Sequence, residues 1–190
     1  MRSGIEAIVM WLEECGVIDS EDMELYEYAL HSLLLMLAPL LMVIVIGIPL
    51  GMVKEGIVMI FPFMLIRKFS GGFHAKNEKN CLILSSALLF ICLLSVKYIV
   101  CGIWLNTAVF VAVISLVCNS PIDCENRRLE KNERKRYKII AGILASSFAI
   151  VCWVGTAAHQ NSWAVCIAIG LILSAGLQVP HIVVKKRKTE

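Results

Sequence analysis

Two residues that could act as a base and a nucleophile lie close together between apolar runs of this 190-residue chain. His74 and Cys81 are seven positions apart, and Gly71-Gly72 stands just before them. A histidine that deprotonates a cysteine produces the thiolate used for covalent peptide-bond cleavage. On one continuous helix the two residues would be separated by about 10 Å of rise. Their pairing therefore requires residues 74–80 to fold back as a loop or turn.

Cys81 stands at the start of an apolar run. A helix beginning there would leave backbone N–H groups unpaired, and its dipole would favour a negative charge. The cations of Arg67, Lys76 and Lys79 would also favour the thiolate, which separates a reactive cysteine from an inert one. Taken alone, such a cysteine is more often a packing residue, and a loop histidine is more often a surface residue. Zinc sites use three or four protein ligands, and one histidine with one cysteine falls short of that number. Neither a metal nor a cofactor is therefore predicted.

The elements that must position these residues are expected to be membrane helices. Hydrophobic types make up 58% of the chain and charged types 17%, against roughly 45–50% (glycine included) and about 25% in soluble domains. A spanning helix needs about 20 mainly apolar residues. Five runs are predicted to be spans: Leu30–Met52, Cys81–Val96, Ile99–Cys118, Ile139–Ala158 and Ser162–Val184. We therefore expect an all-α, polytopic integral membrane protein with about six hydrophobic segments.

The sixth segment, Gly56–Ile66, is short and contains Pro62. It could be a short crossing or a re-entrant hairpin buried in protein. If it crosses, the N-terminus is cytoplasmic; if it forms one crossing with the first span, the N-terminus lies outside. Before these segments, Ile5–Ile18 has apolar residues at helical spacing and predicts an interfacial amphipathic helix too short to span.

The basic residues alternate with the spans. Of the 18 Lys and Arg residues, four lie in 67–79, seven in 119–138 and four in 185–190. Basic loops mark the cytoplasmic side of a membrane, so these three segments are predicted to be cytoplasmic. We predict one membrane domain over residues 1–190, made of an amphipathic helix (1–20), the first span and short segment (30–66), a catalytic cytoplasmic loop (67–80), two spans (81–118), a basic cytoplasmic loop (119–138), two spans (139–184) and a basic tail (185–190).

A basic cytoplasmic face suits anionic lipid headgroups or an acidic peptide. Nucleic acid is not expected as a partner, because the basic residues adjoin the membrane and carry no recognisable nucleic-acid-binding module.

Two motifs in the chain match a known pattern. The first comprises Arg67, Gly71-Gly72, His74-Ala75, Cys81 and Ser85. The second runs from Ser120 to Leu129 and is similar to Pro-x-Asp-x-Glu-Asn-basic-x-Leu, with Cys124 where Thr is usual and Arg128 where Pro is common. Together they resemble the accessory gene regulator B (AgrB-like) family of membrane cysteine endopeptidases, which process quorum-sensing propeptides.

The resemblance implies specific roles. His74 would be the general base and Cys81 the nucleophile that removes the C-terminal tail of a propeptide through an acyl-thioester. Attack by the substrate's own cysteine would then close a thiolactone ring. Arg67, Gly71, Gly72 and Ser85 would support or position the pair. The resemblance also implies a bacterial cell membrane, a substrate with an amphipathic leader and an acidic tail, and a homodimer.

The basic cytoplasmic residues could recruit that acidic tail, or they could merely fix the topology. The candidates are Arg127, Arg128, Arg134, Lys135, Arg136 and Lys138.

The alternative class is a non-enzymatic membrane protein, either a transporter or a scaffold subunit. Transporters usually place polar groups at the bilayer midplane. Here the predicted spans carry almost no ionisable groups beyond His31 and cysteines. This disfavours transport and leaves a scaffold open.

Overall fold

The computed structural model describes residues 2–71, 78–122, 131–158 and 161–179. These parts of the chain form α-helices joined by turns and contain no strand, so the predicted all-α class is confirmed for them. The helices are α1 (Arg2–Glu14), α2 (Met23–Leu50), α3 (Val53–Ser70), α4 (Glu78–Tyr98), α5 (Ile103–Asn119), α6 (Lys131–Ala157) and α7 (Asn161–Gly176), and a 3-10 turn, η1 (Ser20–Asp22), precedes α2.

The chain divides into two compact units, Met1–Leu41 and Met42–Glu190. In the first unit, Ile5 and Val9 of α1 are buried against Ile18 and apolar side chains of α2. Part of the predicted amphipathic face is thus covered within the chain. Ile8, expected on the same face, is exposed, and the interfacial position of α1 stays a prediction.

The reversal between α2 and α3 is made by Gly51. Its φ of 65° is positive, a conformation that glycine adopts without a steric penalty. The N–H of Gly51 donates to the carbonyl of Ile48 at 3.2 Å, and the N–H of Met52 donates to the carbonyl of Gly47 at 2.9 Å. This pair of bonds is a Schellman motif, which satisfies the last carbonyls of a helix. It ends α2 two residues before the predicted end of the first span.

α3 is a single helix that continues through Pro62. Its 18 residues correspond to about 27 Å of helix. The re-entrant hairpin considered for Gly56–Ile66 is therefore not observed. Proline is tolerated here because Pro62 is buried in protein, where neighbouring helices can compensate for the lost backbone hydrogen bond.

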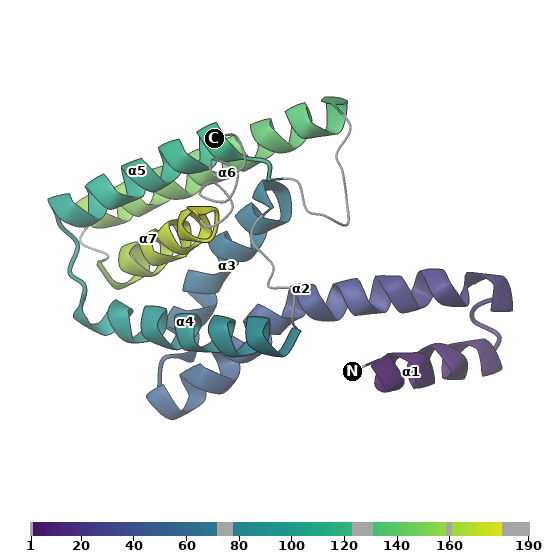
Figure 1. Cartoon of the computed structure of the whole chain (residues 1–190). Coiled ribbons are helices and arrows are strands. Elements are labelled where there is room, and N and C mark those ends of the chain that lie inside the picture. The colour runs from purple at the N-terminus through teal and green to yellow at the C-terminus, as the bar shows by residue number, and fades with distance from the viewer. Residues whose placement is uncertain (1, 72–77, 123–130, 159–160, 180–190) are drawn as a thin grey trace. The chain divides into compact units, whose positions relative to one another are not determined.

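α7 lies at the centre of the second unit (Figure 1). It packs against α3, α5 and α6, and to a smaller extent against α4. Ala168 and Ala175 are buried in this packing. A Cβ on Gly170 would collide with the carbonyl oxygen of Met59 in α3, so the backbones of α3 and α7 approach closely at this point. Small residues allow such approaches between membrane helices, and here Gly170 makes one within the chain.

Two helical stretches of the described residues, Ser20–Leu50 and Asn132–Ala157, are long and apolar enough to cross a membrane by length and composition. α4, α5 and α7 contain shorter apolar stretches. Large apolar side chains are also exposed on α4, α5 and α6, including Ile83, Trp104 and Ile143. Exposed apolar surface of this extent marks contact with a membrane or a partner.

Candidate active site

Four of the predicted site residues lie at the end of α3 and in the first turns of α4. Arg67 is in the last turn of α3, and Gly71 directly follows that helix. Cys81 is the fourth residue of α4, and Ser85 is half-buried about one turn further along. Outside the described residues lie Gly72, His74, Arg127 and Arg128.

The connection between α3 and α4 is shorter than the predicted loop 67–80. α3 extends to Ser70 and α4 begins at Glu78, so the connection comprises residues 71–77. Residues 78–80, which we expected to fold back, are helical. A turn that brings His74 to Cys81 would have to lie within 71–77. The pairing of these two side chains stays a prediction.

Gly71 fixes the direction in which the chain leaves α3. Its φ of 69° and ψ of −167° lie in a region open essentially to glycine alone. The N–H of Gly71 donates to the carbonyl of Arg67 at 3.1 Å and closes the helix. Ser70, the last helical residue, accepts a hydrogen bond on its carbonyl from the N–H of Ile122 at 2.9 Å. A Cβ on Gly71 would collide with the carbonyl oxygen of Ile122, so the two backbones are in direct contact.

This contact joins the segments that carry the two sequence motifs. Ser120 and Ile122 follow α5, begin the second motif and are buried. Gln178, just after α7, donates from Nε2 to the Ser120 Oγ at 2.9 Å. The ends of α3, α5 and α7 therefore meet in one cluster, the motif junction, whose members are buried except for the half-buried Gly71: Ser70, Gly71, Ser120, Ile122 and Gln178.

The motif junction could not be predicted from the sequence. The two motifs are about 50 residues apart in the chain, and in the second one a role was predicted only for Arg127 and Arg128. A signal for Gln178 was present, since it is an uncharged amide in a mainly apolar run. Nothing in the sequence indicated its partner.

The start of α6 lies beside the same end of α3. The rings of Phe69 and Tyr137 meet edge to face, with centroids 5.7 Å apart. Residues 131–138, predicted as part of the loop 119–138, form the first turns of α6. The basic residues described there are all exposed: Arg134, Lys135, Arg136 and Lys138.

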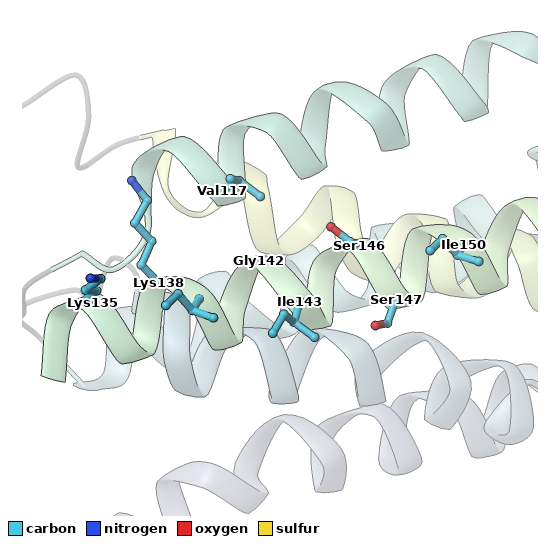
Figure 2. A pocket seen from close by; sticks show the side chains of 9 residues that line it. Val117, Lys135, Lys138, Gly142, Ile143, Ser146, Ser147 and Ile150 are labelled. Atoms are coloured by element: carbon cyan, nitrogen blue, oxygen red, sulfur yellow. The ribbon is translucent and has the colours of Figure 1, made fainter. Parts of the chain in front are cut away.

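A groove of about 650 Å³ runs along α6 beside Val117 of α5 (Figure 2). Lys135 and Lys138 line it at the start of α6. The remaining lining residues, all from α6, are Ile139, Gly142, Ile143, Ser146, Ser147 and Ile150. A cationic end followed by a mainly apolar wall suits an amphipathic ligand that carries negative charge.

Arg67 is half-buried in the last turn of α3. Its guanidinium lies over the ring of Phe63, with Cζ 5.6 Å from the ring centroid. A cation–π contact of this kind restrains the side chain. Arg67 therefore contributes both its backbone carbonyl, to Gly71, and a restrained cation close to the motif junction.

Replacing Gly71 by alanine is expected to destabilise the protein. The backbone conformation alone costs an L-residue about 1–3 kcal/mol, and the new Cβ would also push against the Ile122 carbonyl. The matched control is Gly51→Ala, because Gly51 also has a positive φ but has open space around it. Thermal unfolding of the purified variants measures the difference. Equal losses for the two variants would show that the contact with Ile122 has no energetic role.

Comparisons with known proteins identify the family to which this chain belongs. A sequence model of the family described as accessory gene regulator B matches residues 5–180. The chain is similar to two Clostridium perfringens proteins whose names describe them as AgrB-like, one from strain 13 and one from strain SM101. Each is 24% identical over 135 residues, which is 66% of this chain and 62% of the relative, so the match spans less than two thirds of either relative's length. No solved structure matches. Because the family model covers nearly the whole chain, the protein belongs to the accessory gene regulator B family.

Proposed function

We propose that this chain is a membrane cysteine endopeptidase that processes a quorum-sensing propeptide. The observation that carries the proposal is the motif junction, where the Ile122 N–H binds the Ser70 carbonyl at 2.9 Å and joins the start of the second motif to the end of α3, beside Gly71 of the first motif. Cys81, in the first turn of α4, belongs to the first of these motifs. A nucleophile at a helix N-terminus is favoured as an anion by the helix dipole.

In the proposed first step, His74 accepts the thiol proton of Cys81. The Sγ then attacks the peptide carbonyl where the propeptide's C-terminal tail begins. The C–N bond breaks, and the tail leaves as an amine after receiving the proton from His74. The remaining peptide is held as a thioester on Cys81.

In the second step, the substrate's own cysteine attacks this thioester. A new thioester forms within the peptide, the bond to Cys81 breaks and the Cys81 thiol recovers a proton. The exchange replaces one thioester by another and is nearly balanced in bond energy, whereas attack by water would lose the activation. A site that excludes water therefore favours the cyclic thiolactone over the linear acid.

The proposed location is the bacterial cell membrane, with α2 to α7 as six crossings. α3 counts as a crossing in this topology because it is one continuous helix between α2 and the motif junction. An even number of crossings places both termini on the same side, and the basic segments place that side in the cytoplasm. In this topology the exposed Trp11 of α1 suits the cytoplasmic interface of the bilayer. A homodimer remains a proposal from the family resemblance.

The test is reconstitution of the purified chain in liposomes with a synthetic propeptide that contains an internal cysteine and an acidic tail. Mass spectrometry should find the released tail and a peptide lighter than the linear acid by one water, as expected for a ring. Hydroxylamine should open this product, because it cleaves thioesters. An intact propeptide after incubation with folded protein would contradict the proposal and favour a scaffold.

We assign recruitment of the substrate's acidic tail to the exposed cations at the start of α6. Lys135 and Lys138 line one end of the groove, and the Phe69–Tyr137 contact holds this part of α6 beside the end of α3. A tail bound there would lie close to the segment that enters the proposed catalytic loop. Exposed charges attract weakly one by one, so several are needed to act together.

Reversing the charge of Arg134, Lys135 and Arg136 to glutamate is expected to raise KM about tenfold. That factor corresponds to about 1.4 kcal/mol of binding free energy. Three exposed ion pairs can account for it, because each contributes up to about 1 kcal/mol. Initial rates over a range of propeptide concentrations measure the change. A propeptide with a lysine-rich tail should partly reverse it, and the triple glutamine variant should lie in between. An unchanged KM in a correctly oriented protein would leave these cations with a role in topology alone.

A further inference from the structure

Gln178 is a buried amide at the end of the central helix. Its side chain is 0% exposed, and its Nε2 donates to the Ser120 Oγ at 2.9 Å. Its Oε1 is buried and accepts no hydrogen bond from the described residues. Burying an amide oxygen without a hydrogen-bond donor is unfavourable, because the oxygen loses its hydrogen bonds to water and forms no replacement.

Packing alone does not account for this residue. The other buried polar residue of the α7 region, Ser174, satisfies its hydroxyl within the helix by donating to the Gly170 carbonyl at 2.8 Å. The rest of the buried α7 surface is apolar or glycine. A leucine or methionine at position 178 would fill a similar volume without an unpaired oxygen. Buried polar groups kept at such a cost call for a specific explanation.

A series of contacts connects Gln178 to the end of α3. Gln178 holds Ser120, which is two residues before Ile122. Ile122 in turn holds the carbonyl of Ser70 and lies against Gly71. From Gly71 the chain enters the connection that carries His74. This series of contacts starts next to the end of α7, which is held in place by packing against α3, α5 and α6.

We infer that Gln178 is a positioning residue for the peptidase reaction: through Ser120 and Ile122 it sets the point and direction from which the His74-bearing connection leaves α3. The inference rests on the proposed function. Gln178 does not take part in the chemistry. Gln178 affects the rate at which the bound substrate reacts rather than the affinity for the substrate, because the substrate's acidic tail is assigned to the cations at the start of α6.

The experiment compares Gln178→Met, which keeps the volume and removes the donor, with Ser120→Ala, which removes the acceptor, and with the double variant. Each variant is assayed with the synthetic propeptide in liposomes, after its membrane level and thermal midpoint have been checked. We expect each single variant to lower kcat about tenfold, with KM within about twofold of wild type. The double variant should be no slower than the slower single variant, because both changes break the same bond.

A second readout does not depend on activity. Amide hydrogen exchange of the peptide containing Ile122 should be faster in Gln178→Met and in Ser120→Ala than in wild type, because the bond to the Ser70 carbonyl is loosened. Gln178→Glu, whose carboxyl oxygen can accept from the Ser120 hydroxyl, should recover part of the lost kcat. A folded Gln178→Met protein with wild-type kcat and wild-type exchange at Ile122 would overturn the inference.

Ser120→Ala decides the question if Gln178→Met does not fold. A wild-type kcat with unchanged Ile122 exchange in that variant would overturn the inference, and a lower kcat with faster exchange would support it. Failure of the proposed function gives a different result, since either the wild-type protein would leave the propeptide intact or a Cys81→Ala protein would process it as well as wild type does.

Discussion

Replacing Cys81 by alanine is expected to abolish propeptide cleavage, with a loss of about a thousandfold or more. Removing a covalent nucleophile leaves only the catalysis that binding and nearby dipoles supply. His74→Ala is expected to lose about a hundredfold to ten-thousandfold, the range typical of a general base. Product masses after incubation in liposomes measure both losses.

The chain supplies matched controls for the cysteine. Cys92 lies further along the same helix and is half-buried, and Cys118 is exposed near the end of α5. Alanine at either position is expected to leave cleavage within about twofold of wild type, because neither residue belongs to the motifs. If Cys81→Ala retained cleavage while a control lost it, the nucleophile would be misassigned. Full processing by all three variants would contradict a cysteine mechanism.

Replacing Gly170 by valine is expected to cost about 3 kcal/mol of stability or more, at the upper end of the range for overpacking. At this position even a Cβ would collide with the Met59 carbonyl and approach the Pro62 Cγ to 3.0 Å. The first of these atoms belongs to the backbone of α3, which cannot move aside as a flexible side chain can. α3 and α7 would have to separate, and the motif junction at their ends would be disturbed with them.

The thermal midpoint in detergent and the amount of protein in the membrane measure this effect. Gly176→Val is the matched control, because Gly176 is in the same helix and has open space around it. The control is expected to unfold close to the wild-type midpoint. Similar midpoints for both variants would show that the close approach of α3 and α7 is not required for stability.

The helices themselves could be predicted from the chain. Long apolar runs are visible without any structure, and the five runs predicted to be spans correspond to the helices α2, α4, α5, α6 and α7. Among the described residues, two helical stretches, in α2 and α6, are long and apolar enough to cross a membrane, and the number of spans stays a prediction. Their ends were less predictable. α4 begins at Glu78 and α6 at Lys131, before the apolar runs themselves begin. Charged residues at a helix end are compatible with helical backbone when they face water. They lower the local hydropathy, however, and the predicted bounds depended on hydropathy.

The chemistry-bearing residues were also visible in the sequence, since a motif is a pattern of residue types at fixed spacing. Cys81, His74 and the glycines before them could be proposed from that pattern and its resemblance to a known family. Their mutual distance could not, because 71–77 is a connection whose path depends on what packs against its ends.

What the sequence by itself determined is therefore the helical class of the chain and the candidate residues of the proposed site, because both follow from local residue types and periodicity. Only the tertiary structure decided that α3 continues through Pro62, that α3 and α7 approach closely at Gly170, and that Gln178, Ser120 and Ile122 meet Ser70 and Gly71. These contacts join residues about 50 or more positions apart, and each depends on the shape left between helices after they pack. A linear pattern carries no record of that shape, so the motif junction became visible only in the folded chain.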